Sequence, residues 1–399
     1  MVRFAAHKGS MDLTLAKEYS HSSACIVRNF HRTFPEYSET PLVRLPALAS
    51  ELHIKALYVK DESRRFGLNA FKVLGGSYAI GNYISSLLGI DISSLTFFDM
   101  TSPDAAAALG EKTFITATDG NHGRGVAWTA NRLGQKSVVY MPRGTARERL
   151  DNILLLGSDA SITDLSYDDA VRKAAQDAEK HGWILIQDTS AKGYEAVPQH
   201  IMQGYTTMAL EAVEQLKEDI PTHVFLQAGV GSMAGAVSAF LADYYKEKKP
   251  VITIVEPLSA DCLYQTAAAN DGLLHSVTEE MGTIMAGLAC GEPCREAWDL
   301  LNQYADFYVA VPDSFAASGM TRLAHPLGKD QIIISGESGA AGIGTLIELL
   351  THSPEYSDII RRLGLDSEST VLCISTEGAT DRANYEHITG LSPENLMKK

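Results

Sequence analysis

The sequence predicts an α/β fold of two lobes, each a twisted, mostly parallel sheet flanked by helices. Short runs of β-branched and apolar residues alternate with helix-length amphipathic segments, a pattern typical of parallel sheets covered on both faces. The number of such runs exceeds what one small sheet holds, so two lobes are expected. Polar or glycine-rich turns follow five of the runs, and open parallel sheets bind ligands beyond the carboxyl ends of their strands. These turns predict an enclosed small-molecule site.

The expected elements follow from this alternation. We expect strands at 56–60, 113–118, 136–141, 184–187, 222–228, 251–256, 307–311, 331–335 and 370–375. We expect helices between them, at 123–133, 145–156, 167–181, 198–217 and 232–247. No low-complexity linker interrupts the sequence, so composition alone marks no domain boundary.

Charge and cysteine content exclude several classes of protein. The chain has 399 residues with 34 basic and 49 acidic side chains, a formal charge of −15. Binders of nucleic acid or of an anionic membrane need a basic surface, so we expect neither partner. The N-terminal residues lack the apolar stretch of a secretory signal, and no run is long enough to predict a transmembrane helix. Five scattered cysteines indicate a reducing compartment, and we expect a cytoplasmic protein.

Two further chemical possibilities follow from the cysteines and histidines. Cys262 and Cys290 are far apart in sequence, and whether they pair stays open. The 12 histidines form no H-E-x-x-H pattern, and the cysteines form no C-x-x-C pair, so no metal is expected.

A glycine-rich turn, 229–235 (GVGSMAG), follows an expected strand and begins an expected helix. Glycines let backbone N–H groups approach an anion, and a helix N-terminus adds a positive dipole, so a phosphate is the expected guest. The glycine spacing differs from the dinucleotide fingerprint. Glu256, however, ends the next strand, where a ribose-binding acid would stand, so a dinucleotide-dependent oxidoreductase stays an alternative.

Lys72 lies in an apolar segment, between Phe71 and Val73. Desolvation lowers the pKa of such a lysine and makes it usable as a nucleophile or base. A lysine that only reaches for solvent at a helix edge is the alternative. A phosphate-binding turn together with an activated lysine is the pair that pyridoxal phosphate requires, because it needs an anchor for its phosphate and an amine for a Schiff base.

These motifs resemble those of the fold-type II pyridoxal-phosphate enzymes, the group of threonine dehydratase and tryptophan synthase β. The resemblance is carried by Lys60-Asp61-Glu62 with Ala70-Phe71-Lys72, by Asp119-Gly120-Asn121-His122 and by the 229–235 turn, in the same order. Within this group, the segments RFGLNAFK, TDGNHGRGVAW, IMAGLACGEP, ISGESGA and ISTEG are most similar to those of the diaminopropionate ammonia-lyases.

The resemblance implies a role for each residue around the cofactor, pyridoxal 5'-phosphate. Lys72 forms its Schiff base, Asn121 hydrogen-bonds its 3′-oxygen, and Ser375, or Thr376 next to it, faces its ring nitrogen. The backbone that holds its phosphate is that of Gly229, Val230, Gly231, Ser232 and Met233. A hydroxyl leaves the ring nitrogen largely unprotonated, which favours prompt loss of a β-substituent over transamination.

Two carboxylates indicate the substrate. Asp119 stands where dehydratases of this fold usually have Ser, Ala or Gly, and Ala70 stands where they usually have Ser or Thr. A carboxylate beside the substrate Cα removes a proton from the face opposite Lys72, and it pairs with an additional ammonium group. Asp188, at another strand end, is a second carboxylate for that β-ammonium.

The remaining candidates surround these carboxylates. We expect the substrate to contact Thr118, Asp119, Gly120, His122 and Asp188. Alternative roles stay open: Asp119 as a helix cap, His122 as a packing residue, and Glu337 either near the ring edge or within a turn.

The function implied is an α,β-elimination that converts 2,3-diaminopropionate, L and D, to pyruvate and two ammonia, with Lys72 and Asp119 as the two bases. A serine or threonine dehydratase is the first alternative, and a non-catalytic binder of the cofactor is another. The resemblance also implies a homodimer. Its large domain comprises 1–84 and 206–399, and a small mobile domain, 85–205, is inserted in it.

Overall fold

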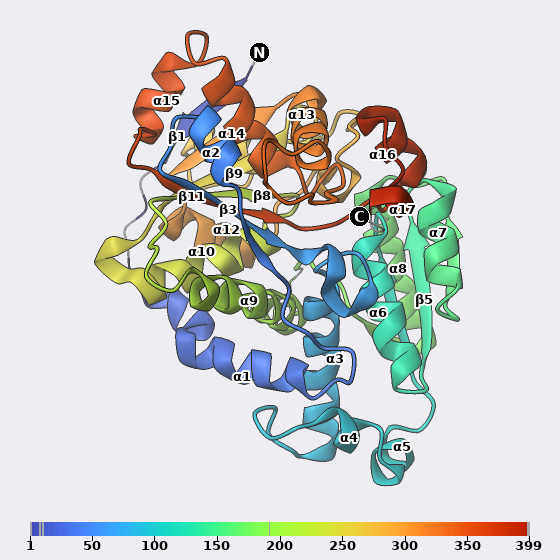
Figure 1. Cartoon of the computed structure of the whole chain (residues 1–399). Helices are drawn as coiled ribbons and strands as arrows, with labels where there is room; N and C mark the ends of the chain where they lie inside the picture. Colours follow the sequence, from blue (N-terminus) through green and yellow to red (C-terminus); the bar gives the residue numbers. More distant parts are fainter. Residues whose placement is uncertain (1, 8, 10–11, 191, 397–399) are drawn as a thin grey trace.

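Two sheets organise the chain (Figure 1). The computed structural model describes residues 2–7, 9, 12–190 and 192–396, and in these residues one sheet has seven strands and the other has four. The larger sheet, in the order β1-β10-β9-β8-β11-β3-β2, comprises β1 (Arg3–Ala6), β2 (Leu42–Arg44), β3 (Ala56–Asp61), β8 (His223–Gln227), β9 (Val251–Pro257), β10 (Phe307–Val311) and β11 (Thr370–Ser375). The smaller sheet, in the order β6-β5-β4-β7, comprises β4 (Thr113–Ala117), β5 (Lys136–Met141), β6 (Asp159–Ile162) and β7 (Ile184–Leu185).

The strand directions confirm the predicted fold class. In the larger sheet only the edge strands β1 and β2 pair antiparallel with their neighbours, and all pairs of the smaller sheet are parallel. The predicted strand at 331–335 is wrong. The backbone N–H of Ile333 donates to Leu323 at 3.1 Å, and no strand of the sheet pairs with this run. Its isoleucines are held by side-chain packing on both sides instead.

Helices bury both faces of the larger sheet. Leu57 and Val59 of β3 point into one core, while Tyr58 between them points into the other, which is the strand alternation that burial on both faces requires. The first face is covered by α2 (Pro46–Glu51), α13 (Asp313–Ala324), α14 (Ala341–Thr351) and α15 (Ser357–Leu363), with α16 (Arg382–Thr389) and α17 (Pro393–Leu396) packed beside α13. The second is covered by α1 (His21–Arg32), α9 (Ala196–Leu216), α10 (Ser232–Tyr245) and α12 (Arg295–Tyr304).

The smaller sheet lies between α8 (Tyr167–His181) on one face and α6 (Asn121–Arg132) with α7 (Arg147–Leu154) on the other. The remaining elements are α3 (Val73–Leu88), α4 (Phe97–Met100), α5 (Pro103–Leu109), α11 (Cys262–Ala269) and the 3-10 turns η1 (Leu15–Tyr19), η2 (Glu62–Gly67), η3 (Lys246–Lys248) and η4 (Ala286–Leu288). None of the helices in the described ranges is long and apolar enough to cross a membrane.

The predicted domain boundaries fall within helices. The position between 84 and 85 lies inside α3, and the position between 205 and 206 lies inside α9, while all four strands of the smaller sheet lie between them. The division into these two domains stays a prediction. Residues 1, 8, 10–11 and 397–399 of the predicted large domain, and residue 191 of the predicted small one, lie outside the described residues.

Three helices approach one another at backbone distance around the start of α3. A Cβ atom on Gly204 of α9 would lie 2.4 Å from the carbonyl oxygen of Leu74, and a Cβ on Gly125 of α6 would lie 2.8 Å from the Cα of Val73. Only glycine permits these contacts. The helix that follows Lys72 is therefore held directly between α9, which packs on the larger sheet, and α6, which packs on the smaller one.

A buried ion cluster fixes the connection between β3 and α3. Arg65 donates to Glu62 at 2.8 Å and to Glu211 of α9 at 2.7 Å, and Lys60 lies 2.8 Å from the same Glu211 carboxylate. The four side chains are buried, and Phe66 beside them has a left-handed backbone with φ 51°. Burial opposes the charge of Glu211, but Arg65 and Lys60 outweigh it and hold the pKa of this carboxyl below its usual range. The cluster ties the segment that carries Lys72 to α9.

The change Glu211→Gln removes the shared anion of this cluster without changing the shape of the side chain. Lys60 and Arg65 then lack one of their counter-charges, and the free energy of unfolding should fall by about 3–5 kcal/mol. Urea unfolding followed by circular dichroism measures it. Because the folded-state pKa of Glu211 is depressed, its contribution is present above pH about 4 and is lost as the pH falls further. The variant should therefore show a weaker loss of stability in acid.

Glu214→Gln is the matched control. This residue lies on the same helix and pairs with Arg28, but its side chain is 42% exposed. Its removal should change the free energy of unfolding by less than about 1 kcal/mol. Equal losses in the two variants would contradict the role given to the buried cluster.

Candidate active site

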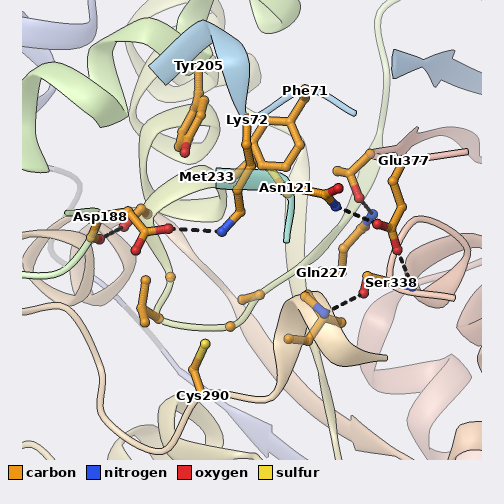
Figure 2. A pocket seen from close by; sticks show the side chains of 18 residues that line it. Phe71, Lys72, Asn121, Asp188, Tyr205, Gln227, Met233, Cys290, Ser338 and Glu377 are labelled. Carbon is orange, nitrogen blue, oxygen red and sulfur yellow. Dashed lines mark hydrogen bonds and ion pairs between the residues drawn. The ribbon is translucent and has the colours of Figure 1, made fainter. Parts of the chain in front are cut away.

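A cavity at the carboxyl ends of the larger sheet's strands is lined by Lys72 and has an empty volume of about 540 Å³, counted with the solvent-open part (Figure 2). Its wall combines residues of both lobes: Phe71, Lys72, Asn121, Asp188, Tyr205, Gln227, Ala228, Gly229, Val230, Gly231, Ser232, Met233, Gly287, Leu288, Cys290, Ser338, Thr376 and Glu377. The structure thus brings together the lysine, the asparagine and the glycine-rich turn that the sequence predicts as one site.

Lys72 forms an ion pair inside the cavity. Its Nζ lies 2.9 Å from Oδ2 of Asp188, while the other oxygen of that carboxylate accepts hydrogen bonds from Tyr167 at 3.0 Å and from Gln187 at 3.1 Å. Burial opposes the charge of Lys72, but Asp188 outweighs it and raises the pKa of the amine. The predicted lowering of this pKa was wrong, because the partly buried lysine is paired with a buried carboxylate.

The ion pair with Lys72 also shifts the pKa of Asp188. Burial opposes its ionisation, yet the Lys72 ammonium holds the pKa of this carboxyl well below its usual range. Both of its oxygens are engaged, one by Lys72 and one by Tyr167 and Gln187. Asp188 therefore fixes the position of the Lys72 amine and stabilises its charged form.

The glycine-rich turn has the features of a phosphate site. Gly231 has φ +100° and caps α10, whose first turn carries no acidic residue. A Cβ on Gly229 would lie 3.0 Å from Sγ of Cys290 and 3.2 Å from the carbonyl oxygen of Gly287, so a larger residue there would force these neighbours to shift. The hydroxyl of Ser232 donates to the carbonyl oxygen of Asp188 at 2.8 Å, which joins the turn to the lysine's partner. The helix N-terminus has no acidic residue in its first turn and lines the same cavity as Lys72. This combination fits pyridoxal phosphate.

Asn121 begins α6 and reaches across to the larger lobe (Figure 2). Its Nδ2 donates to Glu377 at 2.5 Å. Glu377 is fully buried and also accepts from the backbone N–H of Ser338 at 3.0 Å and from the hydroxyl of Thr380 at 3.2 Å. The amide of Asn121 is thereby fixed in one orientation at the cavity wall.

Ser375 and Thr376 occupy different positions. Ser375 is fully buried, and its hydroxyl donates to Ser335 at 2.8 Å rather than lining the cavity. Thr376 lines the cavity and accepts a hydrogen bond from Gln227 at 3.0 Å. The structure therefore favours the second of the two hydroxyls as a group facing the cavity.

Asp119 lines a second, outer cavity that shares Cys290 with the first. Its Oδ2 is buried without a hydrogen-bond partner in the described residues, and Nη1 of Arg149 lies 3.5 Å away. Burial raises the pKa of Asp119, with Lys72 and Arg149 acting in the opposite direction. Glu337 lines the same outer cavity, and burial together with Glu377 raises its pKa to about 7.

Three predicted substrate contacts line neither cavity. The Oγ1 of Thr118 accepts from the backbone N–H of Gly120 at 2.9 Å, and the ring of His122 hydrogen-bonds to the carbonyl oxygen of Ile186 at 2.8 Å. Burial lowers the pKa of His122 and keeps the ring neutral. These residues shape the turn that presents Asp119 and Asn121, and their contact with substrate stays a prediction.

Sequence reasoning missed several residues of the wall, chiefly Gln227, Glu377, Tyr205, Ser338 and Cys290. Two of them had a usable signal. Gln227 ends β8 directly before the glycine-rich turn, and Glu377 follows β11, so both stand at strand ends on the ligand-binding edge. Tyr205 lies in the middle of a helix, and its sequence context carries no such signal.

Glu256 and the cysteines have structural roles. The carboxylate of Glu256 is fully buried and accepts from the backbone N–H groups of Leu263 at 2.9 Å and Tyr264 at 2.7 Å, so it caps α11 and does not reach a ribose. Cys262 and Cys290 are free thiols. Within the part of the chain that the structure describes, no group of His, Cys, Asp and Glu side chains is placed to hold a metal ion.

Known proteins place this architecture in a family. The profile described as "Pyridoxal-phosphate dependent enzyme" matches residues 33–360. The chain is 50% identical to a diaminopropionate ammonia-lyase of Salmonella typhimurium over 90% of each protein.

Solved structures agree. The holo diaminopropionate ammonia lyase of Escherichia coli superposes with a TM-score of 0.91 at 45% identity, covering 98% of this chain and 96% of that one. The same enzyme in complex with D-serine gives a TM-score of 0.90 at 45% identity and covers 98% and 97% of the two chains. The chain therefore belongs to the family of pyridoxal-phosphate dependent enzymes, together with the diaminopropionate ammonia-lyases.

Proposed function

We propose that the chain catalyses the α,β-elimination of 2,3-diaminopropionate, L and D, to pyruvate and two ammonia, with pyridoxal 5'-phosphate as cofactor. The observation that carries this proposal is a cavity lined by Lys72 and a glycine-rich turn, beside an outer cavity lined by Asp119, whose Oδ2 has no hydrogen-bond partner among the described residues. The 50% identity to a protein of that name supports it.

The residues of the cavity fit the cofactor. Lys72 would carry it, Asn121 would hydrogen-bond its ring oxygen, and Thr376, or Ser375 behind it, would face its ring nitrogen. The backbone that would bind its phosphate is that of Gly229, Val230, Gly231, Ser232 and Met233. When bound, the cofactor supplies an electron sink that makes the α-proton of an amino acid acidic enough to remove.

The chain's own residues then move protons. Lys72 takes the α-proton of one enantiomer, and Asp188 at 2.9 Å orients its Nζ and stabilises the ammonium that forms. Asp119 takes the α-proton of the other enantiomer, since the oxygen without a hydrogen-bond partner is available to accept it. The bond from Cβ to the β-ammonium breaks with its electron pair on nitrogen, so ammonia leaves. The enamine product hydrolyses in water to pyruvate and a second ammonia.

The preference for a diamino acid rests on the carboxylates. Asp119 and Glu337 line the outer cavity, each with an oxygen that has no hydrogen-bond partner among the described residues, and an additional ammonium on the substrate offsets their cost of burial. Asp188 lines the inner cavity, where it already pairs with Lys72, and it would contact the β-ammonium of the substrate from there. Thr118, Gly120 and His122 would hold the turn that carries Asp119 in position.

A serine or threonine dehydratase is the alternative. A solved relative has been crystallised with D-serine, so a hydroxy amino acid is able to enter a site of this kind. Asp119 favours the diamino acid, because a hydroxyl leaving group needs no additional anion.

We also propose a homodimer located in the cytoplasm. Closed twofold dimers are the commonest symmetric assemblies. The five free thiols support a reducing compartment.

Turnover of diaminopropionate compared with serine tests the reaction. Purified protein loaded with the cofactor should release pyruvate from L- and D-2,3-diaminopropionate with a kcat/KM at least about tenfold above that for serine, a difference of about 1.4 kcal/mol. A coupled assay for pyruvate measures it. A higher kcat/KM for serine or threonine would establish the dehydratase instead.

The change Lys72→Ala tests the cofactor site. The visible absorbance of a lysine-bound cofactor should be lost, and pyruvate release should fall by at least about 10²-fold, since the base is removed with it. Lys55→Ala, at an exposed lysine, is the control and should keep both. Retained absorbance in Lys72→Ala would refute the assignment of Lys72.

The change Asp119→Asn tests the second base. Pyruvate release from D-diaminopropionate should fall by about 10²–10⁴-fold, whereas release from the L-isomer should fall less. Asp151→Asn, at an exposed carboxylate on α7, should leave both rates unchanged. Equal losses for the two isomers in Asp119→Asn would show that one residue serves both faces.

A further inference from the structure

Two carboxylates at the outer cavity each have one buried oxygen without a hydrogen-bond partner among the described residues. These are Oδ2 of Asp119 and Oε2 of Glu337. The other oxygen of Glu337 accepts from Asn384 at 2.6 Å. A buried carboxylate without a counter-charge costs desolvation free energy, so a nearby cation is expected that offsets the charge and leaves these two oxygens free of hydrogen bonds.

Arg149 supplies that charge from α7. Its Nη1 lies 3.5 Å from Oδ2 of Asp119 and donates to the carbonyl oxygen of the same residue at 3.4 Å, and its Nη2 lies 4.0 Å from Oε2 of Glu337. The side chain of Arg149 is only 6% exposed. Both carboxylate contacts are longer than a direct hydrogen bond, so the guanidinium stabilises each charge and leaves each oxygen open.

Arg149 also supports the backbone of the turn. A Cβ on Gly120, whose φ is +148°, would lie 3.2 Å from Cδ of Arg149. The aliphatic part of the arginine therefore packs against the residue after Asp119, while its head holds the carbonyl of Asp119 itself. The position of the Asp119 carboxylate is set on two sides by one side chain.

We propose that Arg149 is the positioning residue that holds Asp119 in place and ionised as the base for the D-isomer. This inference rests on the proposed function, which makes Asp119 a base. It goes further in naming the residue through which that base is oriented.

The titratable and charged groups that act on Asp119 come from every element around it. They are Lys72 before α3, His122 on α6, Arg149 on α7, Tyr167 on α8, Asp188 after β7, Tyr205 on α9, Cys290 before α12 and Glu377 after β11. Burial raises the pKa of Tyr167, Tyr205 and Cys290, and it lowers the pKa of His122, so these four stay neutral near pH 7. Lys72 and Arg149 are the cations of this set, and Lys72 is committed to Asp188.

The change Arg149→Gln tests the proposal through the pH profile of kcat/KM. Removing the cation raises the pKa of Asp119, so the acid limb for D-diaminopropionate should move upward by about one pH unit, a tenfold loss at a pH below the limb. The acid limb for the L-isomer should not move, because its base is Lys72, and the ion pair of Lys72 with Asp188 is intact in this variant. Arg149→Lys, which retains a cation, should restore most of the D-isomer limb.

Two further measurements separate positioning from a loss of structure. In an Asp119→Asn background, Arg149→Gln should cause no additional loss with the D-isomer, since the group it orients is gone. Arg147→Gln, at an exposed arginine of the same helix, should change neither limb. The midpoint of thermal unfolding of each variant shows whether it is folded.

The outcomes distinguish this inference from the proposed function. If the wild-type protein releases no pyruvate from either isomer, the proposed function is wrong. If it turns over both, but Arg149→Gln moves the two acid limbs equally or adds its full loss to that of Asp119→Asn, the role of Arg149 is overturned while the function stands.

Discussion

The position of Lys72 depends on a contact between backbones. At the start of α3, glycines of α6 and α9 let three helices approach to distances that any side chain would prevent. The first of these helices packs on the smaller sheet and the second on the larger one, so the contact fixes the lysine relative to both sheets at once. The ion cluster around Arg65 fixes the chain just before it, and the next residues have little freedom to move. The active-site lysine is thus placed by packing on either side of it.

Buried charge is used in two ways. In the cluster of Lys60, Glu62, Arg65 and Glu211, hydrogen bonds at 2.7–2.9 Å join anions directly to cations, and such a cluster is chemically inert. At the outer cavity, Arg149 stands 3.5 Å from Asp119 and 4.0 Å from Glu337, so charge is balanced while oxygens stay open. Charge is balanced in both places, but only the shorter contacts occupy the carboxylate oxygens with hydrogen bonds.

Strand-to-turn transitions were well predicted because they depend on local composition. The run at 331–335 shows where this fails: buried isoleucines look the same whether a segment pairs in a sheet or only packs against one. The pKa of Lys72 failed for a different reason. Its partner Asp188 is 116 residues away in sequence, and no local pattern shows that the two meet. Glu377 had a local signal in its place after β11, but no local pattern shows its contact with Asn121, 256 residues away.

The order of strands in the larger sheet has a consequence for synthesis on the ribosome. β11 lies between β3 and β8, and the residues just after it hold both ends of the site: Thr376 accepts from the backbone N–H of Phe71, and Glu377 accepts from Asn121. Lys72 and the glycine-rich turn are translated long before these residues. The cavity is therefore incomplete until residue 377 has left the ribosome, and the wall that joins the two sheets is among the last parts of the chain to form.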